Sequence, residues 1–184
     1  MARLVGISGS LRHGSFNTAL LRAASTLVPV GTTLDVRTLH GVPLYNGDDE
    51  DASGLPAAVQ ALKDAVATAD GVLLATPEYN NSIPGVFKNA IDWMSRPGGD
   101  RTYVFNGRKV AVIGASPGGF GTILAQNAWL PVLRTIGTEL WTGGRLMVSR
   151  AGSVLDEQGA ITDARTKEQL SAFLGAFAAF AAKR

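Results

Sequence analysis

Short apolar runs alternate with longer amphipathic segments along most of this chain. The apolar runs, among them Val-Leu-Leu-Ala and Val-Ala-Val-Ile, lack polar alternation, which is typical of strands covered on both faces. The intervening segments place apolar residues at helical spacing. The pattern predicts strands at Leu4–Ile7, Leu34–Leu39, Gly71–Thr76, Val110–Ala115 and Glu139–Val148, and helices at Phe16–Leu27, Leu55–Ala69, Pro84–Met94, Thr122–Ile136 and Thr162–Ala182.

This alternation predicts an α/β fold with a doubly wound, five-stranded parallel sheet and helices on both faces. In the flavodoxin-like strand order 2-1-3-4-5, the loops after the first, third and fourth strands meet where the strand order reverses, and such sheets bind ligands there. These are the three loops of the chain with unusual chemistry. No linker or repeat of fixed period divides the 184 residues, so we expect a single domain spanning 1–184.

The loop after the first predicted strand is rich in hydroxyl-bearing and basic residues. It would present backbone N–H groups and a helix N-terminus to an anion, with Ser10, Ser15 and Asn17 as side-chain donors and Arg12 as a positive charge. The glycine patterns of triphosphate-binding and dinucleotide-binding loops are absent, which favours the single phosphate of a mononucleotide. A helix cap after an edge loop would explain the same residues, so both interpretations stay open.

The loop after the third predicted strand, residues 76–85, combines two prolines, a tyrosine and two adjacent asparagines. This composition predicts a stiff loop that presents backbone amides at fixed angles. After the fourth strand, glycines at 118, 119 and 121 would let the backbone approach a flat ligand closely. Both loops therefore predict ligand contact, although a well-specified strand-to-helix turn would also explain the first of them.

The segment from Gly114 to Gly118 also matches GxSxG, the nucleophile elbow of serine hydrolases. In that fold the catalytic histidine follows the serine along the chain, whereas both histidines of this chain, His13 and His40, precede it. Because such triads are recognised by geometry rather than by chain order, a hydrolase with Ser116 as its nucleophile remains an alternative function.

Composition and charge narrow the classes of partner. The chain has 17 Lys and Arg against 15 Asp and Glu, scattered without a basic run, so we expect no nucleic-acid partner. It has no cysteine, which excludes disulfides and thiolate metal sites. No signal-peptide pattern and no apolar run of roughly 20 residues is present, which predicts a cytoplasmic protein without membrane contact. The acidic run Asp48–Asp51 indicates a solvated loop rather than a metal site.

Together, three motifs make the chain resemble the NAD(P)H-dependent FMN reductase family, which includes bacterial chromate and quinone reductases and some azoreductases. The resemblance runs from Leu4 to about Trp141 and implies a flavodoxin-like domain with one non-covalent FMN and with NADPH or NADH as co-substrate. The motifs are Gly9-Ser10-Leu11-Arg12 with Ser15-Phe16-Asn17, then Pro77-Glu78-Tyr79-Asn80-x-Ser82-Ile83-Pro84-Gly85, and Ser116-Pro117-Gly118-Gly119-x-Gly121.

By position, the resemblance implies three groups of cofactor contacts. The first holds the FMN phosphate, the second lines the isoalloxazine with a backbone N–H near N5, and the third edges the pyrimidine side of the ring. In that order, they are Ser10, Arg12, Ser15, Phe16 and Asn17; Pro77, Glu78, Tyr79 and Asn80; and Ser116, Pro117, Gly118, Gly119 and Gly121. We expect no catalytic acid or base, because FMN carries the chemistry, and we expect Glu78 to pair locally, for example with Lys88.

The implied activity is ping-pong hydride transfer from the nicotinamide to FMN and on to a small-molecule acceptor: a quinone, an azo compound, chromate or free flavin. A flavodoxin-like electron carrier is the alternative, although such carriers are usually strongly acidic and this chain is not. We expect a homodimer or a tetramer. Phe87, Trp93 and Met94 could supply a partly apolar subunit contact, although a place in the core for all three would explain the same residues. Leu124 and Asn127 stand where some relatives have polar or basic tetramer contacts, which favours the dimer.

Overall fold

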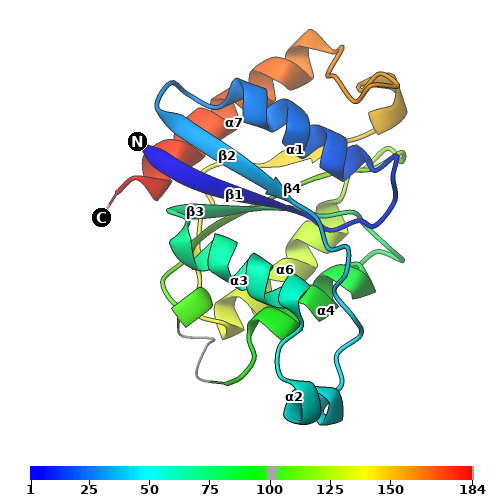
Figure 1. Ribbon diagram of the computed structural model, residues 1–184. Helices are drawn as coiled ribbons and strands as arrows, with labels where there is room; N and C mark the ends of the chain where they lie inside the picture. Colours follow the sequence, from blue (N-terminus) through cyan, green and yellow to red (C-terminus); the bar gives the residue numbers. More distant parts are fainter. Residues whose placement is uncertain (99–102, 184) are drawn as a thin grey trace.

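The computed structural model describes residues 1–98 and 103–183 and has a parallel sheet between two layers of helices (Figure 1). The strand order is β2-β1-β3-β4-β5, and β6 also pairs with β4. The predicted doubly wound fold and its strand order are therefore confirmed. The strands are β1 (Ala2–Ser8), β2 (Thr32–Arg37), β3 (Gly71–Ala75), β4 (Lys109–Ala115), β5 (Glu139–Leu140) and β6 (Leu146–Val148).

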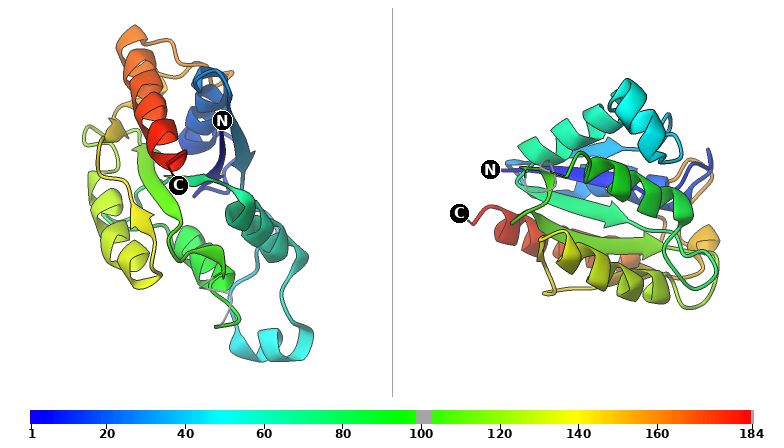
Figure 2. Two further views of the ribbon diagram at one scale, coloured as in Figure 1. Left: turned by 90° about the vertical axis from the view of Figure 1, so that its left-hand side faces the viewer. Right: turned by 90° about the horizontal axis from the view of Figure 1, so that it is seen from below.

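The longer helices divide between the two faces of the sheet, as the views in Figure 1 and Figure 2 show. α1 (Phe16–Leu27) and α7 (Ala164–Ala181) cover one face, and α3 (Ala57–Thr68), α4 (Gly85–Met94) and α6 (Ile123–Thr135) cover the other. Each face has its own hydrophobic core. β3 is buried along its whole length, as expected for an inner strand covered on both faces. No helix within the described ranges has the length and apolar character needed to cross a membrane.

The fifth strand differs from the prediction of one unbroken strand over 139–148. An irregular stretch at 141–145 splits it into β5 and β6. The ring of Trp141 lies so close to Gly143 and Gly144 that a side chain on either would collide with it. The same ring packs edge-to-face on Phe173, with 4.8 Å between ring centroids. Because both short strands pair with β4, the break leaves the strand order unchanged.

The acidic run was predicted to be an irregular loop, but it forms a short helix, α2 (Gly47–Ser53). Asn46 caps this helix by accepting a hydrogen bond from the N–H of Asp48 at 3.0 Å. Three acidic residues fill its first turn, where the helix dipole favours negative charge. No residue of α2 is buried, so the expected exposure to solvent is confirmed. Within 1–98 and 103–183, no three metal-ligating side chains cluster.

α2 belongs to a segment between β2 and α3 that is tied to α4 and its end. The hydroxyl of Tyr45 donates to Glu50 at 2.9 Å, and Arg96 donates to the same carboxylate at 3.0 Å. The indole N–H of Trp93 donates to the carbonyl of Pro43 at 2.9 Å. Desolvation would raise the pKa of Glu50, but the hydrogen bonds from Arg96 and Tyr45 outweigh it and hold that pKa below its ordinary value.

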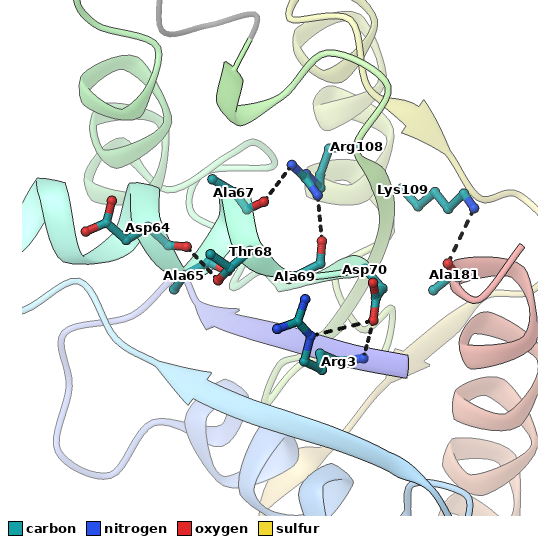
Figure 3. A network of polar contacts seen from close by, with 10 residues as sticks. All are labelled: Arg3, Asp64, Ala65, Ala67, Thr68, Ala69, Asp70, Arg108, Lys109 and Ala181. Carbon is teal, nitrogen blue, oxygen red and sulfur yellow. Dashed lines mark hydrogen bonds and ion pairs between the residues drawn. The ribbon is translucent and has the colours of Figure 1, made fainter. Parts of the chain in front are cut away.

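The amino ends of the strands are closed by a network of polar contacts (Figure 3). Arg108 donates to the carbonyls of Ala69 at 2.6 Å and Ala67 at 3.0 Å, at the end of α3. The backbone N–H of Arg3 donates to Asp70 at 2.6 Å. Desolvation lowers the pKa of the Arg108 guanidinium, whose donors satisfy carbonyls that a helix end leaves unpaired. This end of the sheet is therefore stabilised by structural contacts, and the loops with unusual chemistry lie at the other end.

The prediction that Phe87, Trp93 and Met94 form a subunit contact is wrong. All three are at most 1% exposed within a single chain. Phe87 packs edge-to-face on Trp129, with 4.9 Å between ring centroids. The helical spacing of these residues on α4 marks the face that packs into the core, which is the commonest meaning of such a pattern.

Candidate functional site

The loops that follow β1, β3 and β4 meet at the carboxyl ends of these strands (Figure 1). They border a cavity of about 80 Å³, and every lining residue except Ala115 belongs to the predicted cofactor-binding set. The lining residues are Ser10, Arg12, Ser15, Phe16, Asn17, Pro77, Glu78, Tyr79, Ala115, Ser116 and Pro117. A larger hollow of about 480 Å³ lies beside α3, so the chemistry of the walls, rather than volume, distinguishes the site.

The loop after β1 combines a helix cap with donors for an anion. Ser15 is the N-cap of α1, and its Oγ accepts a hydrogen bond from the N–H of Thr18 at 3.2 Å. Its hydroxyl proton remains available for a second partner. Phe16 and Asn17 follow in the first helical turn, where backbone N–H groups have no intrahelical acceptor. Ser10, which also lines the cavity, is buried. The sequence suggested either a helix cap or an anion site, and because Ser15 caps α1 while its proton stays available, one loop can serve as both.

Asn17 ties α1 to the end of β4. Its Nδ2 donates to the carbonyl of Ala115, and its Oδ1 accepts from the N–H of Ala115, both at 2.9 Å. The side chain is 3% exposed. Both of its polar atoms are engaged within the protein, so only the second Nδ2 proton and the backbone N–H remain for a ligand. Asn17 thus joins the end of the loop after β1 to Ala115, the last residue of β4, where the loop after β4 begins.

The loop after β3 contains a miniature hairpin. Tyr79 and Ser82 exchange two backbone hydrogen bonds, at 3.2 and 3.0 Å. Between them, Asn80 has φ 49° and Asn81 has φ 61°. Two successive positive φ angles are the mark of a type I′ turn, in which asparagine is one of the few side chains that fit. The paired asparagines therefore supply much of the stiffness that the composition of the loop predicted.

Glu78 joins this hairpin to α6. Its Oε2 accepts hydrogen bonds from the N–H groups of Leu124 at 2.8 Å and Ala125 at 3.0 Å, both in the first turn of the helix. A carboxylate is favoured at that position by the helix dipole. The predicted pairing of Glu78 with Lys88 is wrong, because Lys88 pairs with Asp92 at 2.7 Å along α4.

The loop after β4 is closed on itself, yet part of its backbone is open. The Ser116 hydroxyl donates to the carbonyl of Gly121 at 2.6 Å. A side chain at Gly121 would collide with Met147, and its φ of 63° also favours glycine. At Gly119, in contrast, a Cβ would meet nothing within 4 Å, and φ is not in the left-handed range. The protein itself therefore does not require glycine at 119, whereas a ligand lying against the backbone would.

Arg150 and Ala151 also hold this loop, although no sequence motif points to them. The N–H of Arg150 donates to the carbonyl of Gly118 at 2.9 Å, and the N–H of Ala151 donates to the carbonyl of Ser116 at 3.0 Å. Arg150 adopts φ 49°, a left-handed conformation that is strained for a residue with a side chain. It precedes the 3₁₀ helix η1 (Ala151–Ser153). In the sequence, the one indication that Arg150 supports this loop is its position just after β6, because the carboxyl end of β6 reaches the same edge of the sheet.

The geometry gives no support to a serine hydrolase. The hydroxyl of Ser116 is used on Gly121. His40 contacts the carbonyl of Leu11 at 3.2 Å and stacks near His13, with 6.3 Å between ring centroids. Within the described ranges no hydrogen bond joins either histidine to Ser116, so the serine lacks the base that a nucleophile needs.

The residues present fit a flat ligand that carries one phosphate. Serine hydroxyls and first-turn N–H groups form the cradle, with Arg12 exposed beside them. A Cβ at Gly119 would meet nothing within 4 Å, and one at Gly118 would meet only the Ser116 hydroxyl, at 3.9 Å. Fold and site together define a doubly wound α/β protein whose loops at the switch point of the sheet fit a mononucleotide.

Comparisons with known proteins identify the family. The NADPH-dependent FMN reductase family matches residues 2–153. An NAD(P)H-dependent FMN reductase of Pseudomonas aeruginosa is 42% identical over 166 residues, which cover 90% of this chain and 88% of the relative. A 2-hydroxy-1,4-benzoquinone reductase of a Burkholderia species is 37% identical over 182 residues, which cover 99% and 97%. The solved structure of the flavoenzyme NAD(P)H:(acceptor) oxidoreductase FerB from Paracoccus denitrificans superposes with a TM-score of 0.85 at 36% identity, over 98% of this chain and 97% of that one.

The chain belongs to the NADPH-dependent FMN reductase family. It is an oxidoreductase that uses FMN with NAD(P)H, and its fold is flavodoxin-like, as the sequence resemblance implied.

Proposed function

We propose that this protein is a quinone reductase that oxidises NADPH or NADH and reduces a small quinone, with azo compounds, chromate and free flavin as further acceptors. The convergence of an anion cradle and an open glycine backbone at one edge of the sheet carries the proposal. Similar proteins named quinone reductase support the choice of acceptor, among them one from Escherichia coli that is 33% identical over 180 residues.

The loop after β1 would bind the phosphate. Ser10 and Ser15 would donate through their hydroxyls, and Phe16 and Asn17 through their backbone N–H groups at the helix N-terminus. Arg12, which is exposed, would add a charge-assisted bond. When bound, FMN supplies the two-electron chemistry.

The other two loops would orient the ring and stabilise charge on it. The hairpin from Pro77 to Asn80 would line one side, with a backbone N–H of its turn directed at the ring. The N–H groups of Gly118 and Gly119 would donate toward the pyrimidine side, where negative charge collects on reduction. Gly121 and the Ser116 hydroxyl would keep this loop in shape. The hydride donor, NADPH or NADH, and the electron acceptor would occupy the same open face of the flavin ring in turn, which gives ping-pong kinetics.

We further propose a single domain over 1–184 that acts in the cytoplasm as a homodimer. The absence of cysteine fits a reducing compartment. Leu124 and Leu130 of α6 are 44% and 45% exposed. They are therefore better candidates for an apolar contact between subunits than the buried apolar residues of α4. Light scattering tests the assembly, and a monomer at micromolar concentration would contradict it.

The purified protein itself tests the proposed function. Its absorption spectrum should show bound flavin, and acid release followed by mass measurement should give about one FMN per chain; FAD or no flavin would contradict the cradle. Anaerobic NADPH should bleach the flavin without a partner protein, whereas an electron carrier would stay coloured. Parallel lines in double-reciprocal plots with a quinone should confirm ping-pong turnover, and intersecting lines would exclude it.

A further inference from the structure

Two aromatic side chains are exposed on the loops that border the cavity. Phe120, in the loop after β4, is 84% exposed, and Tyr79, in the hairpin after β3, is 44% exposed. Neither ring stacks on another aromatic ring in the part of the chain that the structure describes. One apolar side chain in solvent is ordinary on a protein surface, but here Tyr79 lines the cavity and Phe120 is exposed on another of the loops that border it, so both rings are candidates for contact with a ligand.

The backbone around both rings is held in place, so they are not loose surface residues. Gly121, next to Phe120, accepts the Ser116 hydroxyl at 2.6 Å. Tyr79 is fixed by its two backbone bonds to Ser82. Glu78 then joins the two loops, because its carboxylate accepts hydrogen bonds from the first turn of α6, which begins three residues after Phe120. Hydrogen bonds of the fold therefore hold the backbone of both loops that carry these rings.

We propose that Phe120 is a specificity-determining residue, which stacks on planar acceptors and, with Tyr79 as a second aromatic wall, ranks them by ring area; the inference rests on the quinone reductase function proposed above. A quinone ring is electron-poor and is attracted to the electron-rich face of an aromatic side chain. Two fused rings offer more stacking area than one. An acceptor without a ring, such as ferricyanide, gains nothing from this contact.

The test compares Phe120→Ala and Phe120→Trp with the parent on three acceptors: ferricyanide, benzoquinone and naphthoquinone. For Phe120→Ala, kcat/KM relative to that for ferricyanide should fall about threefold with benzoquinone and about tenfold with naphthoquinone, mainly through KM. Phe120→Trp should restore the preference for two rings. Independently of turnover, the Kd of naphthalene sulfonate, a two-ring compound that accepts no electrons, should rise about tenfold in Phe120→Ala, measured by calorimetry on the FMN-loaded protein.

Val30→Ala is the control, because Val30 is another exposed apolar side chain but lies in the turn before β2, at the amino end of the sheet. It should leave the acceptor ranking unchanged. An equal loss with all three acceptors, or an unchanged Kd for naphthalene sulfonate, would overturn the inference. A smaller mass of Phe120→Ala in light scattering would also overturn it, since Phe120 would then be a subunit contact. If NADPH fails to bleach the parent, the proposed function fails, while the naphthalene sulfonate measurement still decides whether Phe120 binds planar rings.

Discussion

The Ser15 hydroxyl caps α1 and is also proposed to bind the FMN phosphate, and a substitution can separate these two roles. Its Oγ accepts from the N–H of Thr18 at 3.2 Å, which caps α1, while its proton is proposed to donate to the FMN phosphate. Aspartate caps helices as well as serine does. This chain already uses one, because Asp163 caps α7 by accepting from the N–H of Thr166 at 2.7 Å. Ser15→Asp therefore keeps the cap but replaces a donor with a negative charge.

The two effects have different magnitudes. A charge-assisted hydrogen bond is worth about 1.5–3 kcal/mol, so losing it weakens FMN binding about 10- to 150-fold. In Ser15→Asp, repulsion between carboxylate and phosphate adds to this loss, whereas the stability of the apo-protein should stay within about 0.5 kcal/mol of the parent. Ser15→Ala should lose the same bond to phosphate and also about 0.5–2 kcal/mol of stability, because the cap is gone.

Quenching of FMN fluorescence on titration into the apo-protein measures affinity, and thermal unfolding followed by circular dichroism measures stability. Asp163→Ser is the reciprocal control: it exchanges the same two residue types at the cap of α7, outside the predicted cofactor site, and should leave FMN affinity unchanged. If Ser15→Asp binds FMN as tightly as the parent, the first loop is only a helix cap and its assignment to phosphate binding is refuted.

Three further substitutions test the site and its supports. Gly119→Val places a side chain where nothing lies within 4 Å, so the thermal midpoint should stay the same while stopped-flow bleaching by NADPH slows at saturating FMN; an unchanged rate would show that no ligand approaches this backbone. Asn17→Ala removes both bonds to Ala115 and should cost about 2–4 kcal/mol in urea unfolding, and a loss below about 1 kcal/mol would mean that the pairing contributes little. The pKa of Glu50 is lowered by folding, so its stabilising effect is complete above the pKa of the unfolded chain and is lost as pH falls through the lower folded value. Glu50→Gln should therefore flatten the acid limb of a stability-against-pH plot, and coinciding acid limbs would contradict this.

The sequence was sufficient for the layers and the strand order because those depend on local signals. Apolar runs without alternation mark strands covered on both faces, and the loops after the first, third and fourth strands carry the motifs that meet at the switch point. The break between β5 and β6 has another origin. Gly143 and Gly144 are a local signal for it, because they lie against the Trp141 ring, but the packing of that ring on Phe173, 32 residues later, is not visible in any local pattern.

In the candidate site, too, features that depend on consecutive residues could be predicted, and contacts between distant residues could not. The serine-rich loop and the glycines were recognisable, because their chemistry lies in consecutive residues. The partner of Glu78 was not, since the N–H groups it accepts belong to a helix more than 40 residues away. Helical spacing on α4 also could not distinguish a core face from a subunit contact, because both place apolar residues on one side of a helix. A local signal did exist for α2: Asn46 followed by acidic residues is a typical helix start.

The two free edges of the sheet limit how copies of this chain can assemble. At one edge, β2 carries an ion pair between Asp35 and Arg37, with 2.6 Å between the charged atoms. At the other, β5 and β6 are two and three residues long and are separated by the irregular stretch at 141–145. Charged side chains and interruptions of this kind keep an edge from pairing with the strand of another molecule. Any association between copies of this chain would therefore use helices and loops, and neither edge offers the long, flat template on which fibrillar aggregates grow.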